Sequence, residues 1–296
     1  MKIFNLGSIN VDHVYEVASL PNWGETLSST SYSVNLGGKG LNITVAAHRA
    51  GAEVHHIGLV GEGDSLVESM IASFEINSAL IQTSSSPTGH ANVFLNGQSE
   101  NCIVIHGGAN QCFREHQIRS SLSSAQPNDW LVLQNETNAN EVGIKLAREL
   151  GMKIALVAAP FDADTLLSQI SSVDLVAMNE HEAAQYEAAA NLDLRQLNGT
   201  DFVITYGKLG ASFLSGNKEI HVPSHTVNAL DTTGAGDTFF GVFLAHYADG
   251  MPAGSALKYA NAAGALMVQR KGAANVIPTA IEVEMFIASQ KELGLA

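Results

Sequence analysis

The chain has 296 residues, 46% of them hydrophobic, with 29 acidic and 15 basic side chains and a formal net charge of −14. This negative charge repels nucleic acid and anionic membrane surfaces, so neither is expected as a partner, and an anionic substrate needs local positive groups. The length suits one large domain or a large domain with a small appendage, and we expect a single domain over residues 1–296.

Three features indicate a cytoplasmic protein. No apolar run reaches the roughly 20 residues that span a bilayer. After Lys2 the apolar N-terminal run is only about five residues long, which is typical of a buried first strand and not of a signal peptide. Cys102 and Cys112 are the only cysteines, and we expect them to be unpaired thiols in a reducing compartment.

Short apolar runs rich in β-branched residues alternate with helical patterns along most of the chain. The runs predict strands at 2–7, 54–61, 129–135, 153–159, 173–179 and 201–207. Helical spacing occurs at 40–51, 138–151 and 179–190, and the first two of these segments end in glycine. Strands that are buried on both faces and separated by helices predict an α/β fold with a mostly parallel sheet.

Two segments break this alternation, at 12–35 and 89–110. Both have strand-like pieces joined by Gly, Asn and Pro without a helix between them, and the second predicts a hairpin around Asn96-Gly97. We expect these segments to form a small antiparallel sheet outside the main one.

Polar and glycine-rich residues follow the first predicted strand. In "SINVDH", Asn10 and Asp12 can bind sugar hydroxyls or simply begin a turn. In "NLGGKGLN", glycines let the backbone approach a ligand, and Lys39 and Asn42 supply donors. The stretch lacks the spacing of a Walker A loop or a dinucleotide fingerprint. Taken alone, the stretch favours the other interpretation, a turn that leads into a helix with a solvated Lys39.

The segment "DLVAMNEHEAAQ" joins a predicted strand to a predicted helix. Asn179 is the expected N-cap, and Glu182 lies three positions later on the same side of the first turn. A carboxylate and an amide oxygen at the end of a strand suit hydrated Mg²⁺. The same pair also matches a capping box, and one pair can serve both roles. In "ITYGKLG", Thr205 and Gly207 end a strand where a nucleotide phosphate can rest.

The segment "DTTGAGDTF" precedes an apolar helical run. Gly234 and Gly236 permit a tight turn, and a helix beginning near Ala235 offers unpaired N–H groups and the positive end of its dipole. Such a terminus stabilises negative charge. Asp237 is unsuited to binding phosphate because like charges repel, but it can accept a proton from an attacking hydroxyl. Alternatively, Asp237 only complements the helix dipole.

Together these stretches resemble the ribokinase-like (PfkB) family of sugar kinases, along essentially the whole chain. "GGKGLN" (37–42) is similar to the first family signature, and "DTTGAGDTF" (231–239) to the second, which is highly specific. "GSINVDH", "IHGGAN", "MNEHE" and "RKGAANVIP" follow in the family's order and approximate spacing. The resemblance implies a three-layer α/β/α fold and transfer of the γ-phosphoryl of ATP to a sugar hydroxyl. D-ribose, converted to ribose 5-phosphate, is the implied acceptor.

The resemblance also implies roles for individual residues. Asp237 would be the general base, and Gly234, Ala235 and Gly236 would form the anion hole for the transferred phosphoryl group. The sugar would be held by Asn10, Asp12, Gly38, Lys39, Asn42, Glu136 and Asp237. The nucleotide would contact Asn179, Thr205, Gly207, Gly210, Gly236 and Asn261.

Two metal sites are implied as well. Glu182 would act on Mg²⁺ through water. A monovalent cation, K⁺, would lie beside the anion hole, bound by Asp231 and by carbonyls of Thr233, Met267, Arg270 and Gly272. The family commonly has a small hydroxyl residue at the position of Val276, and this departure weakens the case for the cation. The segments 12–36 and 89–108 would form a lid over the sugar and a homodimer contact.

Other functions remain open from the sequence alone. Within the same family, the substrate can be another pentose, a nucleoside or a phosphorylated ketose. A catalytically silent sugar-binding homologue is a different class, although Asp237 and the intact glycine loop argue against it. A dinucleotide-dependent oxidoreductase shares the fold class but would need a fingerprint after the first strand, which this chain lacks.

Overall fold

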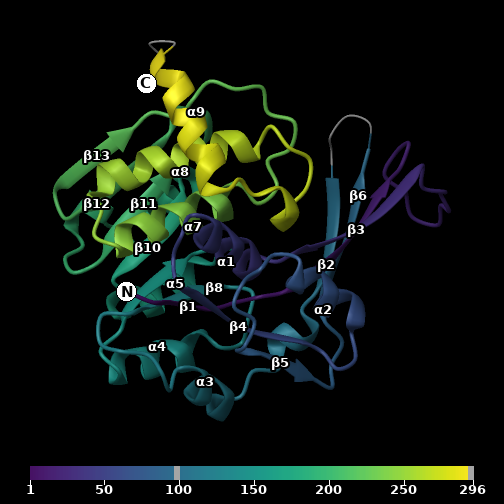
Figure 1. The fold of residues 1–296 in the computed structure, drawn as a ribbon, viewed down its shortest axis with the longest axis horizontal. Coiled ribbons are helices and arrows are strands. Elements are labelled where there is room, and N and C mark those ends of the chain that lie inside the picture. The colour runs from purple at the N-terminus through teal and green to yellow at the C-terminus, as the bar shows by residue number, and fades with distance from the viewer. Residues whose placement is uncertain (97–100, 293–296) are drawn as a thin grey trace.

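In a computed structural model, which describes residues 1–96 and 101–292, a large sheet lies between two layers of helices, and a small sheet projects from one side (Figure 1). The order in the main sheet is β13-β12-β11-β10-β9-β8-β1-β4-β5. Its strands are β1 (Ile3–Leu6), β4 (Val54–Gly61), β5 (Ile81–Ser84), β8 (Trp130–Gln134), β9 (Lys153–Val157), β10 (Leu175–Asn179), β11 (Asp201–Thr205), β12 (Ala211–Ser215) and β13 (Lys218–Val222).

The pairs from β5 to β11 are all parallel, and β12 and β13 extend the sheet in antiparallel fashion. The six strands and three helices predicted from apolar pattern are therefore confirmed, with ends shifted by no more than two residues. The predicted three-layer α/β/α architecture with a mostly parallel sheet is also confirmed.

Each face of the main sheet is covered by its own set of helices. One core joins Phe4 and Leu6 to α3 (Glu115–Ser121), α4 (Asn140–Glu149), α5 (Ala163–Gln169) and α6 (Glu180–Ala190). The other joins Ile3 to α1 (Lys39–Arg49), α7 (Ala235–Ala248) and α8 (Ala253–Met267). The remaining helices are α2 (Ser65–Ala72), α9 (Ala280–Glu292) and short 3-10 turns. Alternate residues of a strand thus enter different cores, as its pleat requires.

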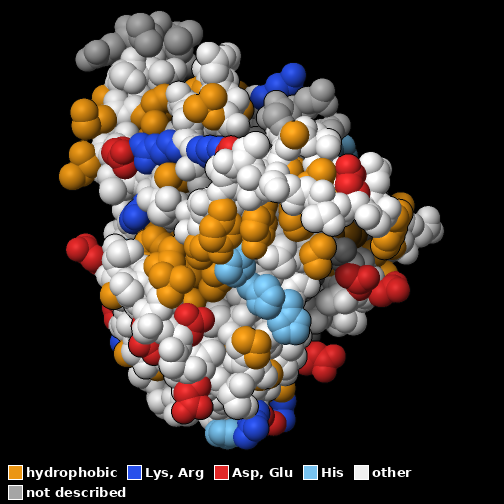
Figure 2. Space-filling model, turned by 90° about the vertical axis from the view of Figure 1, so that its right-hand side faces the viewer, with side chains coloured by type: hydrophobic (Ala, Val, Ile, Leu, Met, Phe, Trp, Pro, Cys, Tyr) orange, Lys and Arg blue, Asp and Glu red, His pale blue; other side chains and the backbone are white. Residues whose placement is uncertain are grey.

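The small sheet has the order β3-β2-β6-β7. Its strands are β2 (Asn10–Glu16), β3 (Ser31–Gly37), β6 (Gly89–Leu95) and β7 (Asn101–His106). The turn of the predicted hairpin at Asn96-Gly97 lies partly outside the described residues. Figure 2 looks onto the side of the molecule that carries this sheet, where hydrophobic and histidine side chains lie next to one another.

The prediction that this sheet is antiparallel is wrong for its central pair. β2–β3 and β6–β7 are antiparallel hairpins, but β2 pairs with β6 in parallel. β2 follows β1 in the chain, and β6 follows β5. β1 and β5 belong to the parallel part of the main sheet. Because parallel strands end at the same edge, the two hairpins leave that edge in the same direction and meet in parallel.

Two further expectations can be compared with the structure. Cys102 and Cys112 are both free, as predicted. Among residues 1–96 and 101–292, no helix is both long and apolar enough to cross a membrane.

Candidate active site

The "GSIN" and "GGKG" stretches meet at the end of β1. Gly40 packs so closely on Gly7 and Ser8 that a Cβ at Gly40 would lie 2.4 Å from the Ser8 nitrogen. Leu41 N donates to Ser8 O at 2.9 Å. Gly38, with φ of 91°, precedes the first residue of α1, a conformation that favours glycine. This tight contact brings the first turn of α1 beside β2.

Glu136 joins the same group from the turn that follows β8, the strand next to β1 in the sheet. Its Oε2 accepts a hydrogen bond from Lys39 N at 3.0 Å and a short one from the Ser8 hydroxyl. Ser8 Oγ also accepts from Gly40 N at 3.3 Å. One carboxylate thus links three segments that are distant in the sequence.

Asp237 enters from the first turn of α7, which packs on α1. A Cβ at Gly241 would lie 2.6 Å from Ile43 O, so the two helix backbones nearly touch there. This approach lets Asn42 Nδ2 donate to Asp237 Oδ2 at 2.8 Å. Asn42 is 5% and Asp237 7% exposed, and Asn42 Oδ1 is buried without a partner among the described residues. The pair therefore places a carboxylate and an amide oxygen that has no partner among the described residues side by side in the interior.

Lys39 is the cation among these carboxylates. Burial by itself lowers the pKa of Lys39, but Asp237, Glu136 and Glu182 raise it above its usual value. Burial raises the pKa of Asp237, an effect that Lys39 and the Asn42 hydrogen bond reduce and Glu136 increases. The arrangement holds a charged lysine next to a carboxylate that binds a proton more readily than usual, which suits general-base chemistry.

Asp12 lies on the same face of β2 as Asn10, two residues away. Its Oδ2 sits against Gly37, where a Cβ would be 2.2 Å away. Burial, and then the nearby charge of Glu136, raise the pKa of Asp12 to about 7. Asp12 therefore titrates near neutral pH, and a polyhydroxylated ligand can either donate to or accept from it.

The α7 N-terminus has the predicted form. Gly234 is the N-cap with φ of 68°, and the helix begins at Ala235. Ala235 N donates to Thr232 O at 3.2 Å, whereas the N–H groups of Gly236 and Asp237 donate to no acceptor in the described part of the chain. Free N–H groups at a helix start can bind an anion.

The predicted capping box is present at α6. Asn179 Oδ1 accepts from the backbone nitrogens of His181 and Glu182, each at 2.9 Å, and Glu182 Oε2 accepts from Asn179 N at 2.7 Å. Glu182 Oε1 remains available for a water-mediated contact. Thr205 lies directly beside Asn179 in the β10–β11 register. The cap does not exclude a magnesium role, because one free carboxylate oxygen suffices for a hydrated ion.

Of the other predicted nucleotide residues, Gly210 and Asn261 lie at the end of β13, Gly207 lies in the 3-10 turn after β11, and Gly236 lies in the first turn of α7. Asn261 is buried and its Nδ2 donates to Val222 O at 3.0 Å and Pro223 O at 3.2 Å. A Cβ at Gly210 would lie 2.2 Å from Val222 O, while Gly207 is exposed. The Asn261 amide hydrogens are therefore already used, and its Oδ1 is the atom left for a ligand.

In the loop predicted to bind a monovalent cation, the Asp231 carboxylate accepts hydrogen bonds from two backbone nitrogens. Its Oδ1 accepts from Thr233 N at 2.9 Å and its Oδ2 from Gly272 N at 3.1 Å. Met267 O accepts from Arg270 N at 3.0 Å, and the Arg270 guanidinium donates to Val276 O at 3.0 Å. The predicted ligands are thus neighbours, although Val276 brings no side-chain oxygen.

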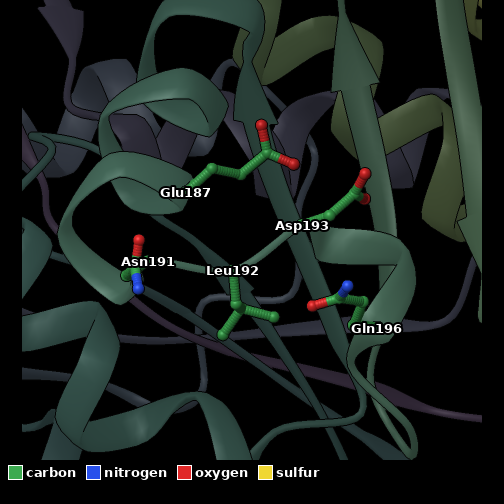
Figure 3. A pocket seen from close by; sticks show the side chains of 5 residues that line it. All are labelled: Glu187, Asn191, Leu192, Asp193 and Gln196. Atoms are coloured by element: carbon green, nitrogen blue, oxygen red, sulfur yellow. The ribbon is translucent and has the colours of Figure 1, made fainter.

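A polar hollow elsewhere is separate from these residues. It is lined by Glu187, Asn191, Leu192, Asp193 and Gln196 (Figure 3). These residues lie in the last turns of α6 and just after it, at the opposite end of that helix from Asn179. None of the predicted site residues lines it.

Sequence reasoning missed two polar residues that touch the predicted sugar-binding set. Ser8 donates to Glu136, and Asn110 Nδ2 donates to Asn10 Oδ1 at 2.8 Å. Both are buried. Both stand in the stretches "GSINVDH" and "IHGGAN", which carry the family resemblance, so their position in a motif was the available signal.

Comparison with known proteins adds independent findings. The family model described as pfkB family carbohydrate kinase matches residues 2–280. A ribokinase from Haemophilus influenzae is 35% identical over 300 residues, covering 95% of this chain and 97% of the relative. A deoxyribokinase from Salmonella typhi is 30% identical over 297 residues, covering 94% of this chain and 96% of the relative.

Solved structures give the same result for the fold. The structure of Arabidopsis thaliana ribokinase complexed with ribose and ATP superposes with a TM-score of 0.80 at 25% identity. The match covers 96% of this chain and 98% of that one.

Proposed function

The chain belongs to the pfkB family of carbohydrate kinases, and on this premise we propose that it transfers the γ-phosphoryl group of ATP to a hydroxyl of D-ribose, forming ribose 5-phosphate. The observation that carries the proposal is the buried Asn42–Asp237 pair beside Lys39, at a helix start with free N–H groups. Relatives that are 35% and 31% identical are ribokinases.

Asp237 accepts the proton of the sugar hydroxyl as its oxygen attacks the γ-phosphorus. Its raised pKa favours proton uptake, and the Asn42 hydrogen bond fixes one carboxylate oxygen, leaving the other for the sugar. The backbone of Gly234, Ala235 and Gly236 stabilises the negative charge of the transferred group. Positioning and charge stabilisation supply most of the catalysis in phosphoryl transfer.

The sugar lies between β2 and the first turn of α1 in this proposal. Asn10 and Asp12 supply side-chain groups from β2, Glu136 supplies its carboxylate from the turn after β8, and Gly38, Lys39 and Asn42 supply groups from the start of α1. Several donors and acceptors converge within one small volume, which suits a compact molecule with many hydroxyls. The small sheet formed by 12–36 and 89–108 acts as a lid over it.

The nucleotide lies at the ends of β10, β11 and β13. Asn179 and Thr205 are neighbours there, and Gly207, Gly210 and Asn261 line the adjacent edge. Glu182 Oε1 would hold a hydrated Mg²⁺ through water, and that ion would neutralise charge on the ATP phosphates.

An ATP-consumption screen tests the proposed function. The purified enzyme is offered ribose, 2-deoxyribose, other pentoses, hexoses, nucleosides and fructose 6-phosphate, and the products are identified by mass and NMR. We expect ribose to give the highest kcat/KM and a product phosphorylated at the 5-hydroxyl. Turnover of a phosphorylated ketose but not of ribose would overturn the ribose assignment and leave the kinase assignment intact.

Deoxyribose is the second candidate because the Salmonella typhi relative is a deoxyribokinase. The two sugars differ by one hydroxyl. If the site hydrogen-bonds that hydroxyl, losing it leaves buried polar groups unpaired and ribose is preferred. Equal kcat/KM for both sugars would favour a general pentose kinase.

A further inference from the structure

Asn110 occupies the junction between the small sheet and the main one. It lies in the 3-10 turn Gly108–Gln111, which follows β7, and it is 1% exposed. Its Oδ1 accepts from Ile9 N at 3.0 Å, and its Nδ2 donates to Ile9 O at 3.0 Å. The second Nδ2 hydrogen goes to Asn10 Oδ1 at 2.8 Å. The oxygen and both amide hydrogens of Asn110 are thus bonded to two consecutive residues, Ile9 just before β2 and Asn10 at its first position.

These contacts fix which way both amides face. The Ile9 backbone presents one donor and one acceptor, so the Asn110 amide fits against it in only one orientation. With its oxygen facing Ile9 N, Asn110 points its second Nδ2 hydrogen at Asn10. Asn10 therefore accepts this hydrogen bond with its side-chain oxygen. The Asn10 nitrogen is therefore turned away from Asn110, and it makes no hydrogen bond to the described part of the chain.

The space around the two amides is closed by Gly89, the β6 partner of Asn10 in the parallel register. A Cβ at Gly89 would lie 2.2 Å from Asn110 Nδ2 and 2.5 Å from Asn10 Oδ1. Packing therefore holds the amides in place in addition to their hydrogen bonds.

We propose that Asn110 is a positioning residue for sugar recognition, which sets Asn10 as a hydrogen-bond donor toward a sugar oxygen. This inference rests on the proposed function. It predicts the direction of one hydrogen bond, because Asn10 offers its N–H group and not its C=O group to the substrate. It also couples the end of β7 to the strand that carries Asn10 and Asp12.

The first test uses the wild-type enzyme with deoxy and deoxyfluoro analogues of ribose at each hydroxyl. Fluorine accepts a weak hydrogen bond but donates none, and hydrogen does neither. If Asn10 donates, the fluoro analogue should exceed the deoxy analogue at the contacted position by about threefold or more in kcat/KM. Asn10→Ala identifies that position, because the variant should lose the difference there and keep it elsewhere.

The second test is Asn110→Asp. The new carboxylate can still accept from Ile9 N but has no hydrogen to give Asn10, so the Asn10 amide should turn its nitrogen toward it and its oxygen toward the sugar. We expect the fluoro and deoxy analogues to become equivalent. KM for ribose should rise about tenfold, with KM for ATP within about twofold of wild type.

Asn138→Asp is the matched control. Asn138 makes the same two-bond clamp, accepting from Phe113 N and donating to Phe113 O, each at 3.1 Å, without a third bond to a predicted sugar residue. It should leave the preference for fluorine over hydrogen intact. Thermal unfolding of all variants separates loss of folding from a change in recognition.

Two results would overturn the inference. One is equal use of fluoro and deoxy analogues by wild type at the position that Asn10→Ala identifies. The other is an unchanged fluorine preference in folded Asn110→Asp. If Asn110→Asp fails to fold, the wild-type and Asn10→Ala comparison decides. If wild type ignores ribose, the proposed function fails, and the same analogues of the accepted sugar decide on Asn110.

Discussion

At the scale of single residues, the role of Asp237 as the general base can be tested by a substitution that replaces one carboxylate oxygen with nitrogen. Asp237→Asn keeps the size of the side chain and a hydrogen-bonding group beside Asn42, so we expect it to fold. Loss of a general base typically reduces the rate by about 10²–10⁴. The loss should appear in kcat and not in KM for the sugar. Steady-state kinetics of a folded variant check this, and near-normal kcat would remove Asp237 from the role of base.

His56 belongs to a buried polar chain behind the first turn of α1. Gln134 Nε2 donates to Asn5 Oδ1, and Asn5 Nδ2 donates to Gly40 O and to Thr44 Oγ1, at 2.7 to 2.8 Å. The Thr44 hydroxyl lies 2.7 Å from His56 Nδ1. Burial lowers the pKa of His56 to about 3. The folded protein therefore keeps His56 neutral throughout the ordinary pH range.

This gives a prediction for stability against pH. An unfolded histidine has a pKa of about 6.5 and the folded one about 3, so between these values only the unfolded chain binds the proton. The free energy of unfolding should fall by about 1.4 kcal/mol per pH unit from this group as pH drops below 6.5.

Urea unfolding at pH 7 and pH 5 checks the prediction, with His56→Asn as the control that cannot titrate. Wild type should lose about 2 kcal/mol more than the variant between these two values. The same loss in both proteins would show that other groups cause the acid sensitivity.

At the scale of elements, the crossing of α1 and α7 decides whether Asn42 reaches Asp237. Gly241 lies at the crossing, where a Cβ would be 2.6 Å from both Ile43 O and Ala46 Cβ. Gly241→Ala should push the helices apart, cost about 1–3 kcal/mol of stability as overpacking does, and lower kcat.

Gly264→Ala in α8 is the control for this prediction, because a Cβ at Gly264 would meet nothing within 4 Å. It should gain up to about 1 kcal/mol from helix propensity. Denaturant unfolding and kcat are measured for both variants. Full activity in Gly241→Ala would show that the crossing does not set the geometry of Asp237.

The loop at 267–276 leads to a prediction about monovalent cations. Asp231 bonds to two predicted carbonyl contributors, Thr233 and Gly272, through their nitrogens. We expect the rate measured in K⁺ to exceed the rates in Na⁺ and in Tris, because a bound cation would stabilise the anion hole next to it. Equal rates in the three buffers would indicate that Val276 marks a lost site.

At the scale of the whole molecule, the small sheet leaves apolar side chains uncovered. Tyr32, Ile103, Val104 and Ile105 are about half exposed or more. Ile105 shares a row with Ala91 and Asp12, whereas Val104 shares the next row, on the other face, with Asn92 and His13. One face can cover the sugar while the other meets a second copy, since exposed apolar strands usually need cover.

We therefore predict a homodimer through the outer face of the small sheet. Light scattering after size exclusion should give twice the chain mass at micromolar concentration. Val104→Glu should give a monomer. Ile220→Glu, on the edge strand β13 and 44% exposed, is the control and should stay dimeric. A monomeric wild type would contradict the prediction.

Much of this protein could be predicted from local sequence signals. Apolar runs and helical spacing predicted six of the nine strands of the main sheet and the helices α1, α4 and α6, and the "MNEHE" pattern predicted the N-cap at Asn179. The start of α7 near Ala235 followed from the glycines before it. These features depend on residues a few positions apart, whose preferences act within one strand or one turn.

Only the tertiary structure decided how these pieces meet. Three contacts join residues that are 30 to 130 positions apart. They are the parallel pairing of β2 with β6, the hydrogen bonds of Ser8 to Glu136 and Gly40, and the hydrogen bond from Asn110 to Asn10. Such contacts follow from which strands become neighbours and where parallel strands end. A local sequence pattern does not determine which strands become neighbours or where they end. Hydrophobic periodicity specifies which face of an element is buried but not which element covers it.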